Sequence, residues 1–168
     1  ALARAIDRDM LADVALRGYK SPATGGFVPP GMPGHSLGIG PVYDPDRARQ
    51  LLAEAGYPSG RGFPIVTALV DTDPGRVEVT RALQAQWRES LGVDIGWEIL
   101  PWAVFLDKVD ESPPHLFYVG WIADYPDPDN FLRVCPDIQH WNAAFDELVE
   151  RTRRSTDQAA RMKLSQAA

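Results

Sequence analysis

The sequence predicts an α/β fold, in which helices flank a small mixed sheet within one domain covering residues 1–168. Two observations carry this prediction. Segments with apolar residues three or four positions apart, typical of helices, alternate with short segments that are β-branched or alternate in polarity. The chain is also long enough to bury a hydrophobic core, and its 45% of apolar residues is ordinary for a globular protein.

Two helices and a proline-rich segment are predicted before the first strand. The first helix is indicated by apolar residues that recur every four positions: Leu2, Ile6, Met10 and Val14. Gly18 is a suitable C-terminal stop for it. Residues 21–45 are too rich in Pro and Gly for a helix or a central strand, and apolar enough to lie ordered across a surface. Asp44 as N-cap and Pro45 at the first helical position then open a helix that ends at Gly56.

The middle of the chain alternates between strands and helices. Residues 65–70 are rich in β-branched side chains and predict a strand, and residues 71–75 predict a turn. A helix follows over residues 79–91. Residues 93–99 alternate between apolar and polar side chains, as in a strand with one covered face.

The last third is predicted to add one strand and three helices. Pro101 starts a short helix that carries Val104, Phe105 and Val109, and residues 116–120 form an apolar strand. Residues 143–154 and 157–166 predict two closing helices. Their candidate N-caps are Asn142 and Thr156.

Composition excludes several classes of protein. A net charge of −6 and the absence of a basic stripe argue against nucleic-acid binding. Cys135 is the only cysteine, so no internal disulfide forms. No segment is apolar over a length that spans a bilayer. Leu2 and Gln166 both lie inside helical patterns, and we therefore expect a piece of a longer protein.

The candidate functional residues lie in the stretch from Gly120 to Phe131, where the predicted strand 116–120 ends. Asp124 stands there between Trp121 and Tyr125. One interpretation is that Asp124 caps the turn into Pro126, as Asp commonly does. The other is that its carboxylate anchors a ligand ammonium group, with the two aromatic rings providing desolvation and a cation–π surface.

Two further hypotheses for this stretch involve Asp127. A calcium loop starting there would need Gly at its sixth position and Glu at its twelfth, but these are Leu132 and Ile138. Asp127, Asp129 and Asn130 are therefore expected to shape turns and a short helix, and no metal site or cofactor is predicted. Asp124 and Asp127 could instead form the acid pair of a hydrolase.

Five segments, in order along nearly the entire chain, resemble the second lobe of the family 5 extracellular solute-binding proteins. They are Ala5-Ile6-Asp7-Arg8; Gly26-Phe27-Val28-Pro29-Pro30-Gly31; Tyr43-Asp44-Pro45 with Leu51-Leu52-Ala53-Glu54-Ala55-Gly56-Tyr57; Leu91-Gly92-Val93; and Gly120-Trp121-Ile122-Ala123-Asp124-Tyr125-Pro126-Asp127-Pro128. The resemblance implies one lobe of a two-lobed periplasmic-binding-protein-like fold of type II. Such receptors are about three times as long as this chain, and the first lobe is missing here.

The resemblance also implies a function. In peptide-type members the aspartate at the position of Asp124 meets the α-ammonium group of the ligand, and backbone groups matching Gly120 and Ile122 pair with the peptide like an added strand. The implied ligand is an oligopeptide or dipeptide, and the implied partner is the permease of an ABC importer. No catalysis is implied.

Several alternatives stay open under this resemblance. A nickel complex or an oligosaccharide could be the solute instead of a peptide, and the hydrolase hypothesis with Asp124 and Asp127 remains a distant rival. The implied location is the periplasm or the outer face of the cytoplasmic membrane, with a lipid anchor as an option for the full-length protein.

Overall fold

The computed structural model describes residues 1–15, 18, 20–23, 25–134 and 143–167. These residues form two compact units. The first unit combines residues 1–22 with residues 41–119, and the second combines residues 23–40 with residues 120–168. The single lobe over residues 1–168 stays a prediction.

The first unit is built on a three-stranded sheet with the order β2-β1-β3. Its strands are β1 (Val66–Asp71), β2 (Ile95–Leu100) and β3 (Phe117–Tyr118). Both neighbouring pairs are parallel, with Val66 opposite Ile95 and Leu69 opposite Phe117. The predicted small sheet is confirmed, although its described strands are all parallel rather than mixed. Because the strands are parallel, the chain must return to the same end of the sheet before each new strand begins. A helix makes each of these returns.

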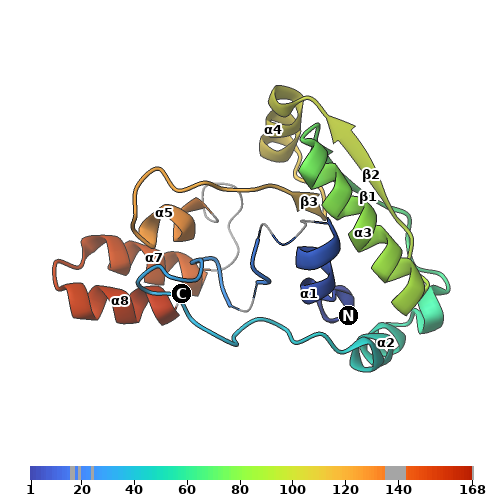
Figure 1. Ribbon diagram of the computed structural model, residues 1–168, viewed down its shortest axis with the longest axis horizontal. Coiled ribbons are helices and arrows are strands. Elements are labelled where there is room, and N and C mark those ends of the chain that lie inside the picture. The colour runs from blue at the N-terminus through green and yellow to red at the C-terminus, as the bar shows by residue number, and fades with distance from the viewer. Residues whose placement is uncertain (16–17, 19, 24, 135–142, 168) are drawn as a thin grey trace. The chain divides into compact units, whose positions relative to one another are not determined.

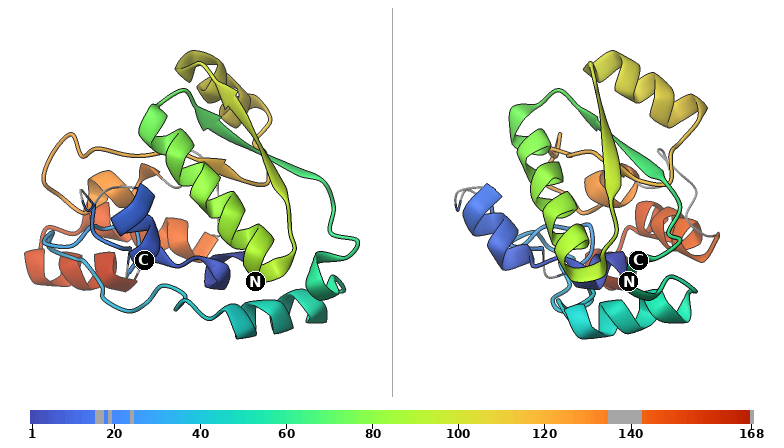
Figure 2. Two further views of the ribbon diagram at one scale, coloured as in Figure 1. Left: turned by 45° about the vertical axis from the view of Figure 1, so that its right-hand side comes forward. Right: turned by 90° about the vertical axis from the view of Figure 1, so that its right-hand side faces the viewer.

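Two helices make these crossovers and cover the sheet. Helix α3 (Pro74–Leu91) joins β1 to β2 and contacts both, and α4 (Trp102–Glu111) joins β2 to β3 and contacts β1 (Figures 1 and 2). The buried core of this unit lies mainly between α3 and the face of the sheet that α3 covers. Its buried members are Ala5, Ala48, Leu52, Ala68, Val79, Leu83, Trp87, Leu91, Val93 and Ile95. The rings of Trp87 on α3 and Trp97 on β2 stack with centroids 6.5 Å apart.

Local sequence signals account for the ends of two helices. Helix α2 (Pro45–Glu54) begins after Asp44, whose carboxylate accepts a hydrogen bond from the Arg47 amide at 2.8 Å, as predicted. Helix α3 begins after Asp73, which caps it in the same way, so it starts inside the residues expected to form only a turn. It ends at Gly92, whose φ of +67° is the left-handed conformation that glycine adopts without strain.

Two predictions for this unit are wrong in part. The single N-terminal helix is a series of short turns: η1 (Leu2–Ala5), α1 (Arg8–Met10) and the π-helical η2 (Leu11–Ala15). The break falls at Asp7, because its side chain accepts the Met10 amide and so caps a new helix instead of continuing the old one. The predicted strand over residues 116–120 is only the two residues of β3.

The second unit is helical. It contains α5 (Asp129–Leu132), α7 (Ala143–Arg154) and α8 (Gln158–Ala167), with α7 and α8 packed side by side (Figure 1). Its small core consists of Val28, Leu132 and Val149. Both closing helices are confirmed, but Asp157 caps α8 by accepting the Ala160 amide at 2.8 Å, and not Thr156. The other candidate cap, Asn142, lies outside the described residues, as do Cys135 and His140.

Candidate functional site

The stretch singled out by its sequence is an exposed loop of the second unit. Trp121 is 46% exposed and Ile122 is 90% exposed, and the side chains of Asp124 and Tyr125 are also exposed. Because β3 ends at Tyr118, Asp124 does not directly follow a strand as expected but lies well beyond it in the loop. Within the described residues, the backbone groups of Gly120 and Ile122 form no hydrogen bond.

The buried side-chain amide of Asn130 is hydrogen-bonded to this loop. Asn130, on α5, is fully buried, and its side-chain oxygen accepts hydrogen bonds from the Trp121 indole at 2.7 Å and from the Asp124 backbone amide at 3.2 Å. Its amide nitrogen donates to Oδ2 of Asp124 at 3.3 Å. In the described part of the chain, the other carboxylate oxygen of Asp124 has no hydrogen-bonding partner and no Lys or Arg pairs with it. The turn-cap interpretation therefore accounts for one carboxylate oxygen at most.

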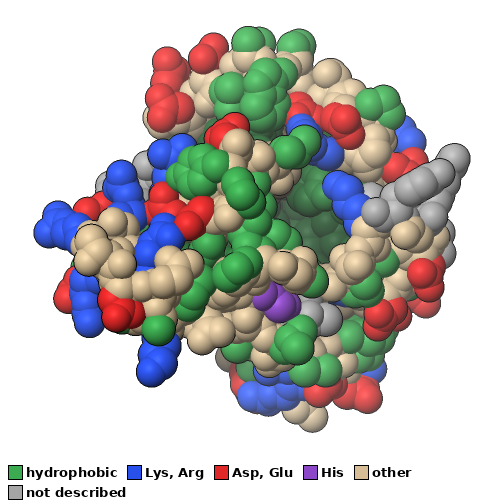
Figure 3. Space-filling model, turned by 60° about the vertical axis from the view of Figure 1, so that its left-hand side comes forward, with side chains coloured by type: hydrophobic (Ala, Val, Ile, Leu, Met, Phe, Trp, Pro, Cys, Tyr) green, Lys and Arg blue, Asp and Glu red, His purple; other side chains and the backbone are tan. Residues whose placement is uncertain are grey.

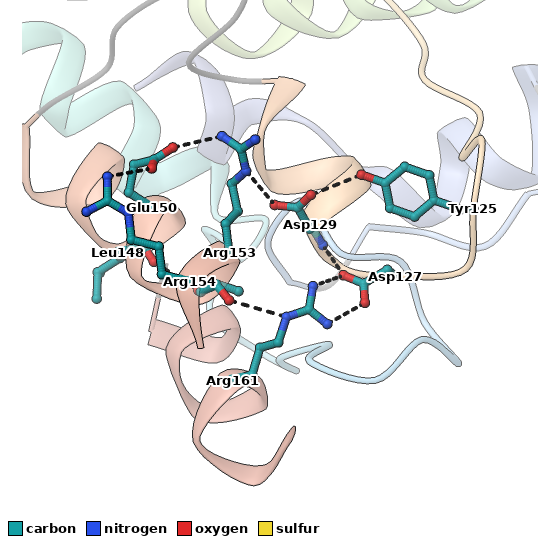
Figure 4. A network of polar contacts seen from close by, with 9 residues as sticks. Tyr125, Asp127, Asp129, Leu148, Glu150, Arg153, Arg154 and Arg161 are labelled. Atoms are coloured by element: carbon teal, nitrogen blue, oxygen red, sulfur yellow. Dashed lines mark hydrogen bonds and ion pairs between the residues drawn. The ribbon is translucent and has the colours of Figure 1, made fainter. Parts of the chain in front are cut away.

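Ion pairs fasten the end of the loop to α7 and α8 (Figure 4). Arg161 on α8 donates to both carboxylate oxygens of Asp127, at 2.5 and 2.6 Å. Asp129 accepts a hydrogen bond from the Tyr125 hydroxyl at 3.0 Å and lies 3.7 Å from Arg153 on α7. These contacts bring together residues far apart in the sequence, and they hold the loop on a helical base.

The Arg161 hydrogen bonds hold the pKa of Asp127 below its usual range, against the opposing effect of partial burial. Asp127 is therefore a carboxylate near neutral pH, already bound by a guanidinium and by the Asp129 amide. A general acid must carry a proton at the working pH. Asp127 therefore cannot act as the proton donor in the alternative hypothesis of an acid pair with Asp124.

We expect Asp127→Asn to lower the free energy of unfolding by about 2 kcal/mol at pH 7, since a charge-assisted hydrogen bond in a partly buried site is lost. A carboxyl group whose pKa is lowered by folding stabilises the folded state at pH values above its unfolded pKa of about 3.9. This contribution disappears as the pH falls through the folded pKa. The difference between the two proteins should therefore vanish in acid. Urea unfolding at pH 7 and in a series below pH 4 measures it, with the exposed Asp107→Asn as control. A difference that persists in strong acid would contradict the ion pair as its cause.

The first unit carries a separate hollow at the carboxyl end of β1. It has a volume of about 310 Å³ and is lined by Asp71, Thr72, Asp73, Arg76 and Trp102. Arg76 pairs with the buried Asp71 and lies over the Trp102 ring, 5.8 Å from its centroid. Sequence analysis assigned residues 71–75 to a turn and gave no role to Arg76 or Trp102. The buried carboxylate already balances the charge of this arginine.

Charged side chains of both signs share the surface. On the face shown in Figure 3, Lys and Arg side chains lie interspersed with Asp and Glu. Among the described residues, no group of three or more His, Cys, Asp or Glu is placed to hold a metal ion. None of the helices in the described ranges combines the length and the apolar character needed to cross a membrane.

Comparison with known protein families decides the family. The model of the bacterial extracellular solute-binding proteins, family 5 Middle, matches residues 1–141. The chain belongs to this family. The members of family 5 are solute-binding proteins, and the resemblance seen in five sequence segments is thereby confirmed.

Individual relatives agree with this placement of the family 5 chain. It is 28% identical over 178 residues to the oligopeptide-binding protein OppA of Bacillus subtilis, covering 98% of this chain and 32% of the relative. It is similar in structure to a periplasmic oligopeptide-binding protein of Borrelia burgdorferi, with a TM-score of 0.86 and 25% identity, over 99% of this chain and 35% of the other. A dipeptide-binding protein of Pseudoalteromonas sp. SM9913 in complex with Met-Leu matches equally well, with a TM-score of 0.86 and 26% identity, over 99% and 35% of the two chains.

These matches confirm the type II periplasmic-binding-protein fold. The family 5 chain spans about a third of the length of the relatives it matches. The activity, ligand and partners of the whole protein therefore remain proposals.

The structure brings only two of the predicted site residues together on a common partner. Trp121 and Asp124 meet on Asn130, and Tyr125 is joined to Asp129 instead. Sequence analysis assigned Asn130 to loop shape and gave Arg161 no role. Arg161 has no local signal, since its side-chain bonds to Asp127 cross 34 positions in the sequence. The partners of Asn130 lie only six and nine positions away, but they follow no helix or strand periodicity.

Proposed function

We propose that this chain forms one wall of the ligand cleft of a two-lobed receptor, which captures peptides outside the cytoplasmic membrane and delivers them to the permease of an ABC importer. Family membership supports this, as do relatives named for oligopeptide and dipeptide binding. The receptor would lie in the periplasm or at the outer face of the membrane, and a lipid anchor there is compatible with the proposal. The missing first lobe would close on the solute by a hinge motion.

One observation carries the peptide proposal at the level of residues. Asp124 presents an exposed carboxylate beside the half-exposed Trp121, while within the described residues no side-chain cation neutralises it. An anion next to an aromatic face suits a ligand ammonium group, which gains a charge-assisted hydrogen bond and a cation–π contact. We assign the α-ammonium group of a peptide to Asp124.

The backbone beside Asp124 fits the remainder of a peptide. Gly120 and Ile122 leave their backbone groups unused within the described part of the chain, and Ile122 extends its side chain into solvent. An extended ligand can pair with such backbone groups as an added strand, which binds peptide main chain irrespective of sequence. We propose Gly120 and Ile122 as backbone partners, with Trp121 and Tyr125 as neighbouring surfaces.

We propose no catalytic step. In the hydrolase alternative Asp127 is unsuited to donate a proton, because its ion pair with Arg161 keeps it ionised near neutral pH, and the same ion pair occupies both of its carboxylate oxygens. Turnover of peptide or glycoside substrates by the intact receptor, abolished by Asp124→Asn, would contradict this proposal.

Mass spectrometry of ligand co-purified with the intact receptor tests the class of solute. Peptides with free amino termini are the expected result. A nickel complex or an oligosaccharide as the bound species would replace the peptide proposal while leaving the family unchanged. Calorimetric titration of the delipidated, ligand-free receptor with di- to pentapeptides provides the corresponding affinities.

The isolated chain should bind peptides weakly or not detectably. A two-lobed receptor encloses most of the ligand surface between its lobes, and one wall supplies only part of the contacts. Isothermal titration calorimetry of the 168-residue chain measures this directly. Binding with a dissociation constant in the micromolar range would show that one lobe is sufficient.

A further inference from the structure

We infer that Asn130 is the positioning residue of the ligand site, because it fixes the direction of the Asp124 carboxylate and of the Trp121 ring before any ligand arrives. This inference rests on the proposed function, since it gives a role in peptide capture to a residue that does not itself touch the ligand. Asn130 thus has a different role from Asp127 and Asp129, which form ion pairs with α8 and α7.

The orientation of the Asn130 amide follows from its neighbours. An indole N–H and a backbone N–H can only donate, and both point to the same end of this side chain, at 2.7 and 3.2 Å. That end must therefore be the oxygen, because a flipped amide would place two donors against its NH2 group. The NH2 group is left facing Oδ2 of Asp124, at 3.3 Å.

Burial makes this arrangement rigid. Asn130 is fully buried, so water cannot replace its hydrogen bonds. Its backbone amide donates to the Asp127 carbonyl at 3.1 Å at the start of α5, and Leu132 on the same short helix lies in the core of the second unit. The amide is thus anchored through both its backbone and its helix.

The consequence for binding is preorganisation. One carboxylate oxygen of Asp124 is held by Asn130, the other has no partner among the described residues, and the Trp121 indole is held by the same Asn130 side chain. A ligand then pays less to order these side chains on binding. A carboxylate free to rotate would accept an ammonium group less selectively.

Two substitutions in the intact receptor distinguish the contact of Asn130 with Asp124 from its contact with Trp121. Asn130→Asp keeps an oxygen for the Trp121 indole but places a second carboxylate against Asp124, whereas Asn130→Ala removes both contacts. Thr152→Val is the matched control, because Thr152 is another fully buried polar residue of the second unit whose hydroxyl donates to the Leu148 carbonyl of α7 at 2.9 Å and, in the described ranges, forms no hydrogen bond with a loop residue. Its backbone carbonyl, which accepts from Arg161, is unchanged by the substitution. The readouts are the ratio of affinities for a free-amine dipeptide and its N-acetylated form, and the ¹⁵N–¹H signal of the Trp121 indole, assigned with Trp121→Phe.

For Asn130→Asp we expect the affinity ratio to fall about tenfold, since the new carboxylate no longer holds the Asp124 side chain and repels it. The indole signal should stay near its wild-type position, because an acceptor oxygen remains. Asn130→Ala should change both readouts, and Thr152→Val neither. A wild-type ratio in folded Asn130→Asp, alongside a reduced ratio in Asp124→Asn, would overturn the role of Asn130 and leave the proposed function standing. A wild-type receptor that binds no peptide would overturn both.

The wild-type protein provides a test that does not depend on a variant folding. The Trp121 indole hydrogen should be protected from solvent exchange in the ligand-free receptor, and its signal should be as sharp before peptide is added as after. Rapid exchange without ligand would show that the site is ordered by the ligand, and would overturn the inference.

Discussion

Replacing Asp124 by asparagine in the intact receptor should weaken the binding of free-amine peptides by about 10- to 100-fold. The substitution keeps the size of the side chain and removes its charge, so the ligand ammonium group loses a charge-assisted hydrogen bond. Peptides with an acetylated amino terminus carry no such charge, and their affinity should stay close to that of the wild type. Calorimetric titration with the same dipeptide in both forms measures the difference.

Two controls make this result specific. Asp110→Asn removes an exposed carboxylate on α4, outside the loop, and should leave both affinities unchanged. Thermal unfolding of each variant tests whether the loop is intact. If Asp124→Asn weakened free and acetylated peptides equally, Asp124 would be a structural turn residue, and the ammonium anchor would have to be sought elsewhere.

Replacing Phe105 by alanine should lower the free energy of unfolding of this chain by about 3–5 kcal/mol, the usual cost of removing a buried phenylalanine. Of the side chains that the structure describes, Phe105 is the largest that is fully buried, at 1% exposure. It joins α4 to the sheet, with its ring centroid 5.7 Å from that of Trp102 and 6.5 Å from that of Phe117 on β3. The cavity would lie between a crossover helix and the sheet, where neighbouring groups have little freedom to close it.

Its neighbour Val104 provides the matched control. Val104 occupies the preceding position of α4 and is 43% exposed, so Val104→Ala should change the free energy of unfolding by about 0.5 kcal/mol or less. Urea unfolding followed by circular dichroism compares the two variants with the wild type. Similar losses for both would mean that α4 does not pack on the sheet as the structure has it.

The two units of the chain depend on different kinds of interaction. The first is held by apolar packing between α3, α4 and a parallel sheet, as a crossover fold requires. The second has a small apolar core and relies on ion pairs and on the buried amide of Asn130 to hold its exposed loop. An exposed loop buries few apolar residues of its own, and polar contacts with the neighbouring helices hold this one in place.

Local signals made much of the fold predictable. Asp44 and Pro45 act within one helical turn of their own positions, and the start of α2 was predicted from them. The same local logic was incomplete at Asp7, because a four-residue apolar repeat and a capping aspartate compete for the same backbone. The structure shows that the cap prevails there. It also shows β3 to be two residues long, since strand length depends on the partner strand available and not on apolar content alone.

The sequence by itself determined the α/β class, most helix and strand positions, the family, and the stretch from Gly120 to Phe131 as the candidate site. Only the tertiary structure decided how that stretch is supported. Trp121 and Asp124 meet on Asn130, and Asp127 meets Arg161 from a distant helix, through side-chain contacts that no periodicity encodes. The physical reason is range. Capping and periodicity act over a few residues, whereas the direction of a carboxylate depends on buried partners that approach it only after the chain has folded.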